Sequence, residues 1–219
     1  MSHQPSEEEL RNIARQLRQP EGDHGIRTGE MMNVSNIGMT NSAIEALNLC
    51  DEETVLEIGH GNGGHIASLL SKALDLKYVG ADISETIVTE AKRINTGFIG
   101  QVDFKLTDGI SLPFSDAQFD KIFSVNTIYF WGNPGAYLLE IKRVLKPGGS
   151  LVLSFADKSF MEKLPFTKYG FTLYDLDAII DLLQEAGFND GESIRKTEQI
   201  KSSAGFMVER DYYVVSASR

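Results

Sequence analysis

The sequence predicts an α/β fold built around a mostly parallel β-sheet. Short apolar runs rich in β-branched residues alternate along most of the chain with segments whose apolar residues recur at helical spacing. Strands separated by helices in this way form parallel sheets with the helices packed against them. A length of 219 residues is sufficient for one well-buried domain and short for two independent ones.

The clearest unit in the chain is a strand, a tight turn and a helix between Glu53 and Leu70. Gly59, Gly61 and Gly63 occupy alternate positions of the turn, where the missing Cβ permits positive φ and lets a ligand lie against bare backbone. The helix that follows directs unpaired N–H groups and the positive end of its dipole into the same space. This pattern favours a nucleotide-like ligand. The alternative is a glycine-rich turn that only connects strand to helix.

Glu57 lies in that strand, two residues before the first glycine. A carboxylate is an unusual residue for a buried strand unless it holds a cation or the N–H groups of the neighbouring loop. Gly59, Gly61 and Gly64 also satisfy the Gly-x-Gly-x-x-Gly pattern of dinucleotide-binding dehydrogenases. An NAD-dependent oxidoreductase is therefore a second interpretation.

The next strand, residues 76–82, ends in an acid. Asp82 lies 21 positions after Gly61, about the separation at which a carboxylate accepts hydrogen bonds from ribose hydroxyls. Ile83 would then line an adenine pocket. The simpler interpretation is that Asp82 is a turn residue before a helix capped by Ser84.

The third strand, residues 102–107, ends in Asp108 and Gly109. The carboxylate can accept a hydrogen bond from the exocyclic amino group of an adenine, while the glycine leaves the edge of the ring unobstructed. Asp-Gly is also ordinary turn chemistry, so this pair has a purely structural interpretation as well.

Val55–Gly63 resembles the first motif of the class I S-adenosylmethionine-dependent methyltransferases, in the branch similar to the ubiquinone and menaquinone biosynthesis enzymes. His60 and Asn62 stand where small residues are more usual. Later segments resemble further signatures of that family: Leu112–Phe114, Phe119–Asp120 and Val144–Gly149. The resemblance covers the chain from about Asn41 to Phe155.

This resemblance implies a Rossmann-like, seven-stranded, mostly parallel sheet with helices on both faces and a C-terminal antiparallel hairpin. It implies S-adenosyl-L-methionine as the cofactor. Asp108 matches the family's adenine-binding acid, and Asn126 matches a position whose backbone lies near the sulfonium. The expected cofactor-binding residues are Glu57, Gly59, Gly61, Gly63, Asp82, Ile83, Asp108, Gly109 and Asn126. No metal is expected, because no His/Cys/Asp cluster has metal-ligand spacing.

Aromatic residues follow the fourth strand, residues 119–125, at the end where ligands bind in open α/β sheets. Residues 129–131 either pack against the sulfonium or a flat substrate, or they seat the next helix. The candidate general bases are His60, His65, Tyr129 and Tyr169. Each is better explained by a cofactor-loop, helix-surface or packing role, so no catalytic residue is assigned.

Residues 1–40 are predicted to form an N-terminal helix and a lid-like segment ahead of an S-adenosylmethionine-binding domain, residues 41–219. Ser6 and Glu9 form a capping-box pattern before a helix over about residues 7–17. Residues 22–41 mix glycines, polar residues and methionines. This composition predicts an irregular lid over a cleft, or a mobile arm, rather than a core element. A short helix is expected to follow.

The remaining expected elements are a helix from Asn133, a strand over 150–155, an irregular wall over 156–173, a helix over 176–183, and strands over 193–201 and 207–217 joined through 202–205.

The formal net charge of −10 disfavours nucleic acid and anionic membranes as partners. One cysteine, Cys50, excludes an intramolecular disulfide. The polar, acidic N-terminus and the lack of a long apolar run predict a cytoplasmic protein without membrane insertion.

The sequence therefore predicts in-line methyl transfer from S-adenosylmethionine to a small-molecule acceptor. An NAD-dependent oxidoreductase and a protein that binds S-adenosylmethionine without turnover are the alternatives. Specificity for the acceptor is expected to depend on the lid-like segment and on residues 156–173.

Overall fold

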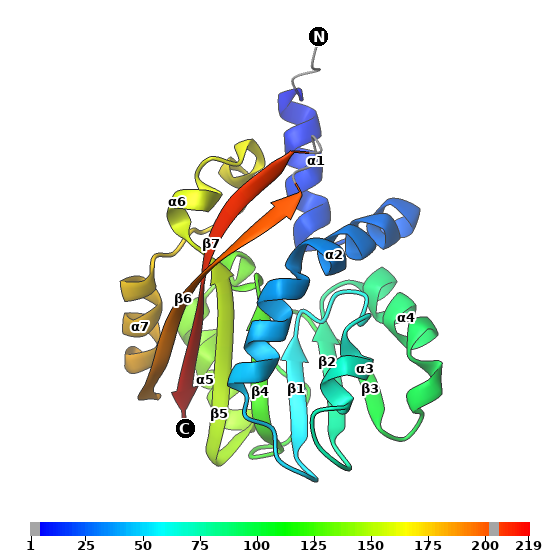
Figure 1. Ribbon diagram of the computed structural model, residues 1–219, viewed down its shortest axis with the longest axis vertical. Coiled ribbons are helices and arrows are strands. Elements are labelled where there is room, and N and C mark those ends of the chain that lie inside the picture. The colour runs from blue at the N-terminus through cyan, green and yellow to red at the C-terminus, as the bar shows by residue number, and fades with distance from the viewer. Residues whose placement is uncertain (1–4, 202–205) are drawn as a thin grey trace.

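One seven-stranded sheet organises the molecule (Figure 1). The structure, a computed structural model, describes residues 5–201 and 206–219. The strand order is β3-β2-β1-β4-β5-β7-β6. The strands are β1 (Thr54–Ile58), β2 (Lys77–Asp82), β3 (Val102–Leu106), β4 (Phe119–Val125), β5 (Leu145–Ala156), β6 (Asn189–Lys201) and β7 (Met207–Ser218).

The first five strands pair in parallel, and β7 pairs antiparallel with both β5 and β6. The predicted C-terminal hairpin at one edge of a mostly parallel sheet is therefore confirmed. Its predicted connection, residues 202–205, lies outside the described residues. Strand β5 starts at Leu145, earlier than expected, because the chain pairs with β4 at Phe119 before a register shift.

Helices cover both faces of the sheet, as the resemblance implied. The α-helices are α1 (Glu7–Arg18), α2 (Gly22–Ala46), α3 (Ile66–Leu70), α4 (Glu85–Ile94), α5 (Pro134–Val144), α6 (Lys158–Met161) and α7 (Leu176–Glu185), with 3₁₀ turns at Thr96–Phe98, Ile128–Phe130 and Pro165–Lys168. Neighbouring residues of β1 show the division: Val55 packs in the core on the α2, α3 and α4 face, and Leu56 in the core on the α5 and α7 face. The period of two along a strand produces this two-sided core.

Helix α2 overturns the prediction of an irregular segment over residues 22–41. The segment and the short helix expected after it form one 25-residue helix, which crosses the predicted domain boundary after residue 40. The glycines allow close packing: a Cβ on Gly25 would lie 2.6 Å from the Pro20 carbonyl carbon, and one on Gly29 would lie 2.8 Å from Ile87 Cδ1. Tertiary contacts thus override a composition that disfavours helix.

The C-terminal half of α2 belongs to the core. Met39 and Ala43 are fully buried, and α2 contacts β4, β5 and the terminal hairpin. Figure 1 shows α2 crossing in front of the sheet, with its N-terminal half next to α1 and α4. A helix with one half in the core and one half above the strand ends can position side chains over a ligand.

The N-terminal helix α1 starts as predicted. Ser6 Oγ accepts a hydrogen bond from the Glu9 backbone N–H at 3.3 Å, and the Ser6 backbone N–H donates to Glu9 Oε2 at 2.7 Å. The segment predicted to be irregular over 156–173 contains α6 and a 3₁₀ turn, against which α1 packs. Arg11 lies 4.5 Å from the centre of the Tyr169 ring at this contact. None of the described helices has the length and apolarity required to cross a bilayer.

Candidate functional site

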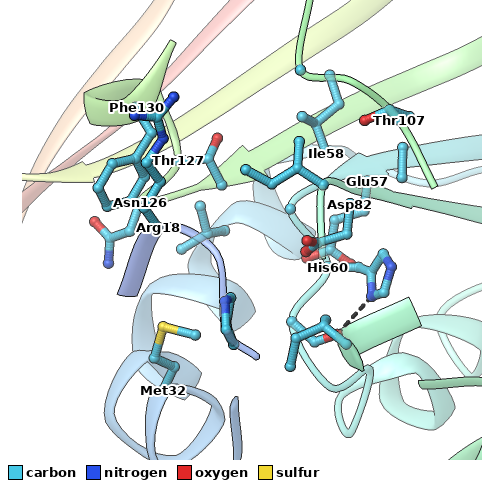
Figure 2. A pocket seen from close by; sticks show the side chains of 18 of the residues that line it. Arg18, Met32, Glu57, Ile58, His60, Asp82, Thr107, Asn126, Thr127 and Phe130 are labelled. Carbon is cyan, nitrogen blue, oxygen red and sulfur yellow. Dashed lines mark hydrogen bonds between the residues drawn. The ribbon is translucent and has the colours of Figure 1, made fainter. Parts of the chain in front are cut away.

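A cleft of about 340 Å³ opens at the carboxyl ends of β1, β2 and β4, beneath α1 and α2 (Figure 2). Eight of the nine predicted cofactor-binding residues line it: Glu57, Gly59, Gly61, Asp82, Ile83, Asp108, Gly109 and Asn126. Parallel strands bring their carboxyl ends to one edge of the sheet, so residues from distant parts of the sequence meet there.

The glycine turn exposes bare main chain to the cleft. Gly61 has a φ of +56°, and a Cβ placed on it would meet no atom within 4 Å. Gly59 also has positive φ, and a Cβ there would collide with Thr127. Gly61 is therefore the position at which an added side chain would enter the cleft itself.

Gly63 is the predicted residue that does not line the cleft. A Cβ on Gly63 would lie 2.8 Å from Asn95 Nδ2 and 2.9 Å from Ile66 Cδ1, so this glycine permits close packing of the turn. The Asn95 side chain donates to the Gly63 carbonyl at 3.2 Å. The helix that follows, α3, has only 5 residues, so its dipole contributes less than the sequence suggested.

Asp82 lies at the cleft and also acts as a turn residue. Its carboxylate lines the cleft, and its Oδ1 accepts a hydrogen bond from the Ser84 backbone N–H at 2.9 Å. Burial raises the pKa of Asp82, although nearby His60 and backbone N–H groups oppose the shift. Ser84 caps α4 as expected, accepting from the Ile87 backbone N–H at 3.1 Å.

Asp108 likewise lines the cleft and shapes a turn. Its Oδ1 accepts from the backbone N–H groups of Ile110 and Ser111, each at 2.8 Å. These hydrogen bonds lower the pKa of Asp108, which keeps it ionised at neutral pH. Gly109 has a φ of +72°, and a Cβ there would approach Ile83 to 3.1 Å.

Glu57 pairs with side chains, where the sequence pointed to loop N–H groups or a cation. His65 Nε2 lies 2.7 Å from Glu57 Oε2, and the Tyr78 hydroxyl donates to the same oxygen. Burial lowers the pKa of His65, but the adjacent Glu57 carboxylate outweighs it, and the net shift is upward. Burial and Glu57 both raise the pKa of Tyr78. The interpretation of His65 as a helix-surface residue is wrong, since it is 6% exposed.

Asn126 ends β4 in a left-handed conformation, with a φ of +57°. Its Oδ1 accepts from the Tyr129 hydroxyl at 3.0 Å and from the Ala156 backbone N–H at 3.2 Å. Its Nδ2 donates to Asn36 Oδ1 at 3.2 Å, which links the site to α2. Tyr129 is thus a packing residue, whereas Phe130 and Trp131 line the cleft.

Two of the candidate bases, His60 and His65, line the cleft. Burial lowers the pKa of His60, and its Nδ1 lies 2.6 Å from the Gly61 carbonyl oxygen. Its Nε2 is buried without a hydrogen-bond partner within residues 5–201 and 206–219. The geometry describes a neutral imidazole packed in the turn, 4.9 Å from the Phe104 ring between centroids.

Residues of the N-terminal helices complete the cleft and were not singled out from the sequence. They are Leu17, Arg18 and Pro20 from α1 and its end, and Met32, Asn33, Asn36 and Thr40 from α2. The prediction of a lid-like segment could not identify these side chains. Only a helical periodicity for residues 22–40 would have indicated which of them face the same side.

Comparisons with known proteins agree with this geometry. A family model described as a methyltransferase domain matches residues 56–153. Phosphoethanolamine N-methyltransferase 1 of Arabidopsis thaliana is 29% identical over 175 residues, covering 77% of this chain and 35% of that enzyme. An uncharacterized protein of Methanocaldococcus jannaschii is 32% identical over 154 residues, covering 66% of this chain and 67% of that protein.

A solved structure shares the fold. Phosphoethanolamine N-methyltransferase 2 of Haemonchus contortus, in complex with phosphomonomethylethanolamine and S-adenosylhomocysteine, aligns with a TM-score of 0.70 at 18% identity, covering 96% of this chain and 60% of that one. The chain spans about a third of the length of the plant relatives it matches, 35% for the Arabidopsis enzyme.

The sheet topology and the cleft at its carboxyl edge define a Rossmann-like nucleotide-binding protein. The family comparison makes this more specific: residues 56–153 match a methyltransferase domain. Two solved structures that share this fold are complexes with S-adenosylhomocysteine and with S-adenosylmethionine. Placement within the quinone-biosynthesis branch stays a prediction.

The cleft itself fits S-adenosylmethionine. Gly61 offers main chain with no neighbouring atom in the direction of an added Cβ, which leaves room for a ligand against the turn. Asp82 and Asp108 supply hydrogen-bond acceptors at neighbouring strand ends, as the hydroxyl and amino groups of an adenosine require. Ile83 and Ile87 add apolar surface between them.

Proposed function

We propose that this chain transfers the methyl group of S-adenosylmethionine to a small-molecule acceptor by in-line displacement. The observation that supports this most is the single cleft in which bare main chain at Gly61, the Asp82 carboxylate and the Asp108 carboxylate converge. The names of the plant relatives, phosphoethanolamine N-methyltransferases, support a small acceptor.

Each predicted residue has a proposed role. Asp82 accepts hydrogen bonds from the ribose hydroxyls, and Asp108 accepts one from the adenine amino group. Ile83 and Gly109 lie against the adenine ring. The main chain at Gly59, Gly61 and Asn126 borders the methionine portion, with Glu57 behind it. Gly63, which packs the turn, supports this arrangement indirectly.

The bound cofactor supplies an activated methyl group on a sulfonium, which is a good leaving group. The protein therefore has to align the acceptor and exclude water. Met32, Phe130 and Trp131 line the cleft with apolar surface suited to that role. A general base is required only for an acceptor that must lose a proton, and we assign none. His60 is held neutral by its lowered pKa and has one nitrogen directed at a carbonyl.

Calorimetric titration with S-adenosylhomocysteine and NADH tests the cofactor assignment. We expect binding of S-adenosylhomocysteine, and Asp82→Ala should weaken it roughly 10- to 150-fold, because hydrogen bonds to a charged group contribute about 1.5 to 3 kcal/mol. Glu85→Ala is the matched control, an exposed acid three residues along that does not line the cleft. If NADH binds and S-adenosylhomocysteine does not, our proposal is wrong and the NAD-dependent oxidoreductase is the better interpretation.

Turnover is tested separately. Release of S-adenosylhomocysteine from S-adenosylmethionine is measured with a panel of small amines and phenols, phosphoethanolamine among them. Acceptor-dependent release supports the enzyme. Cofactor binding without release from any acceptor would instead indicate a protein that binds S-adenosylmethionine without turnover.

A further inference from the structure

One cationic side chain lines an otherwise acidic cleft. Arg18, in the last turn of α1, is the only lysine or arginine among the lining residues, whereas Glu57, Asp82 and Asp108 contribute carboxylates. The chain as a whole has a formal net charge of −10. The carboxylates of the cleft and the negative net charge of the chain would repel an anionic small molecule unless a cationic side chain in the cleft bound it.

Arg18 has no counterion among the residues that the structure describes. Its side chain makes no hydrogen bond or ion pair with any residue in 5–201 or 206–219, although acids are abundant. Other arginines of the chain are paired with carboxylates: Arg11, Arg15, Arg93, Arg143, Arg195 and Arg210. A free guanidinium in a cleft presents a fork of N–H donors that matches the geometry of carboxylate and phosphate.

The position of Arg18 separates it from the proposed adenosine site. Figure 2 shows Arg18 with Asn126, Thr127 and Phe130 on one side of the cleft, and Asp82 with Glu57 and His60 on the other. In our proposal the acids at the ends of β2 and β3 hold the adenosine, and Asn126 borders the methionine portion, so the acceptor approaches the transferred methyl group from the Arg18 side. The aromatic ring of Phe130 and the neighbouring Trp131 supply apolar surface there.

We propose that Arg18 binds an anionic group, a phosphate or a carboxylate, on the methyl acceptor. The inference rests on the proposed function, because it assumes that the adenosine of the cofactor occupies the acidic side and that the methyl group faces the Arg18 side. It makes Arg18 a specificity-determining residue, which orients the acceptor without taking part in methyl transfer.

The test is direct binding to protein loaded with S-adenosylhomocysteine. Calorimetry compares benzoate and phenyl phosphate with benzamide, a neutral molecule of nearly the same shape as benzoate. We expect at least one anion to bind roughly tenfold or more tightly than benzamide to the wild type. Arg18→Gln should remove that preference, and Arg18→Lys should retain part of it. The anion that binds distinguishes a phosphate from a carboxylate acceptor.

Arg27→Gln is the matched control. Arg27 is an exposed arginine on α2 that lacks a side-chain partner in the described part of the chain and does not line the cleft. It should behave as wild type.

Three results would overturn the inference. The first is a wild type with no preference for either anion, and the second is a preference that survives in Arg18→Gln. The third is a loss of S-adenosylhomocysteine binding in Arg18→Gln that is as large as the loss of anion binding. The last result would mean that Arg18 holds the carboxylate of the cofactor. The loading step keeps the two proposals distinct. Wild-type protein that does not bind S-adenosylhomocysteine contradicts the proposed function, whereas loaded protein without anion preference contradicts only the role of Arg18.

Discussion

Gly61 and Gly100 share a backbone conformation and open surroundings but lie in different parts of the molecule. Both have positive φ, +56° and +86°, and a Cβ on either would meet no atom within 4 Å. Gly61 lines the cleft, and Gly100 lies on the connection before β3. The pair therefore separates the effect of backbone strain from the effect of filling the cleft.

We expect Gly61→Val to weaken binding of S-adenosylhomocysteine by at least about tenfold, because the side chain occupies space that the ligand requires. Both Gly61→Val and Gly100→Val should lose about 1 to 2 kcal/mol of stability, the cost of an L-residue in the left-handed region. Calorimetry and urea unfolding measure the two effects. Unchanged binding in Gly61→Val, or an equal loss in Gly100→Val, would contradict contact between the ligand and the turn.

Glu57 and His65 form a buried pair whose contribution to stability depends on pH. Their side chains are 3% and 4% exposed, and Glu57 raises the folded-state pKa of His65 above 6.5 in spite of burial. A histidine with a raised pKa stabilises the fold below its unfolded-state pKa, and this contribution is lost as pH rises through the folded-state value.

The difference in unfolding free energy between the wild type and His65→Gln should therefore be larger at pH 6 than at pH 9. At pH 6 we expect about 3 to 5 kcal/mol, because removing one partner leaves the other charge buried. Urea midpoints at both pH values measure this difference. His24→Gln, at an exposed histidine of α2, is the control and should change the free energy of unfolding little at either pH. A His65 difference that does not change with pH would contradict the pairing.

At the scale of elements, Arg210 of β7 fastens the hairpin to α2. Its Nη1 donates to Asn36 Oδ1 at 2.9 Å, its Nη2 to the Ser35 carbonyl at 2.7 Å, and its Nε to Glu198 Oε1 at 3.0 Å. Asn36 in turn accepts from Asn126 at the end of β4. The hairpin thereby positions the part of α2 that lies over the cleft.

Arg210→Met should destabilise the protein by about 3 to 5 kcal/mol, since it leaves the Glu198 carboxylate without its cation and removes a donor to the Ser35 carbonyl and to Asn36. Arg195→Met on β6 is the matched control: its ion pair with Asp211 has an arginine side chain that is 60% exposed. Such a pair contributes less than about 1 kcal/mol. Urea unfolding measures both variants.

Adding Glu198→Gln to the Arg210→Met variant should recover part of the loss, because the uncompensated charge disappears. Similar destabilisation by Arg210→Met and Arg195→Met would show that the buried network contributes no more than a surface pair.

At the scale of the whole molecule, the N-terminal helices form a cover over the carboxyl edge of the sheet. The junction between α1 and α2 is hydrogen-bonded to the residues that follow Asp82: Gln19 Nε2 donates to the Ile83 carbonyl at 3.0 Å, and the backbone N–H of Gly22, the first residue of α2, donates to Thr86 Oγ1 in α4 at 3.2 Å. A ligand that contacts Asp82 and the cover would therefore stabilise both.

Saturation with S-adenosylhomocysteine should slow amide hydrogen exchange in residues 17–36. A ligand at 100 times its dissociation constant adds about 2.7 kcal/mol, so amides that exchange through opening of the cover should slow up to roughly 100-fold. Amides of α7, on the opposite face of the sheet, should change much less. Hydrogen exchange read by mass spectrometry tests this, and equal slowing in both regions would argue against a cover that responds to the cofactor.

The sequence by itself determined the fold class, the order of the strands along the chain and the part of the cleft that lies at the strand ends. These depend on local signals: β-branched runs define strands, positive-φ glycines define the turn, and acids placed at strand ends meet because parallel strands share an edge. Gly63 was predicted to line the cleft but packs inside the turn. A glycine required for packing and a glycine required for a ligand look the same in a sequence.

Only the tertiary structure decided the form of residues 22–40 and the partners of the buried polar groups. A glycine-rich segment becomes helix α2 because Gly25 and Gly29 allow close contacts with Pro20 and Ile87, which no local pattern records. Glu57 meets Tyr78, and Arg18 reaches the cleft, through the packing of separate elements. Hydrophobic and turn preferences act between neighbours in the chain, whereas these contacts depend on how the finished elements pack together.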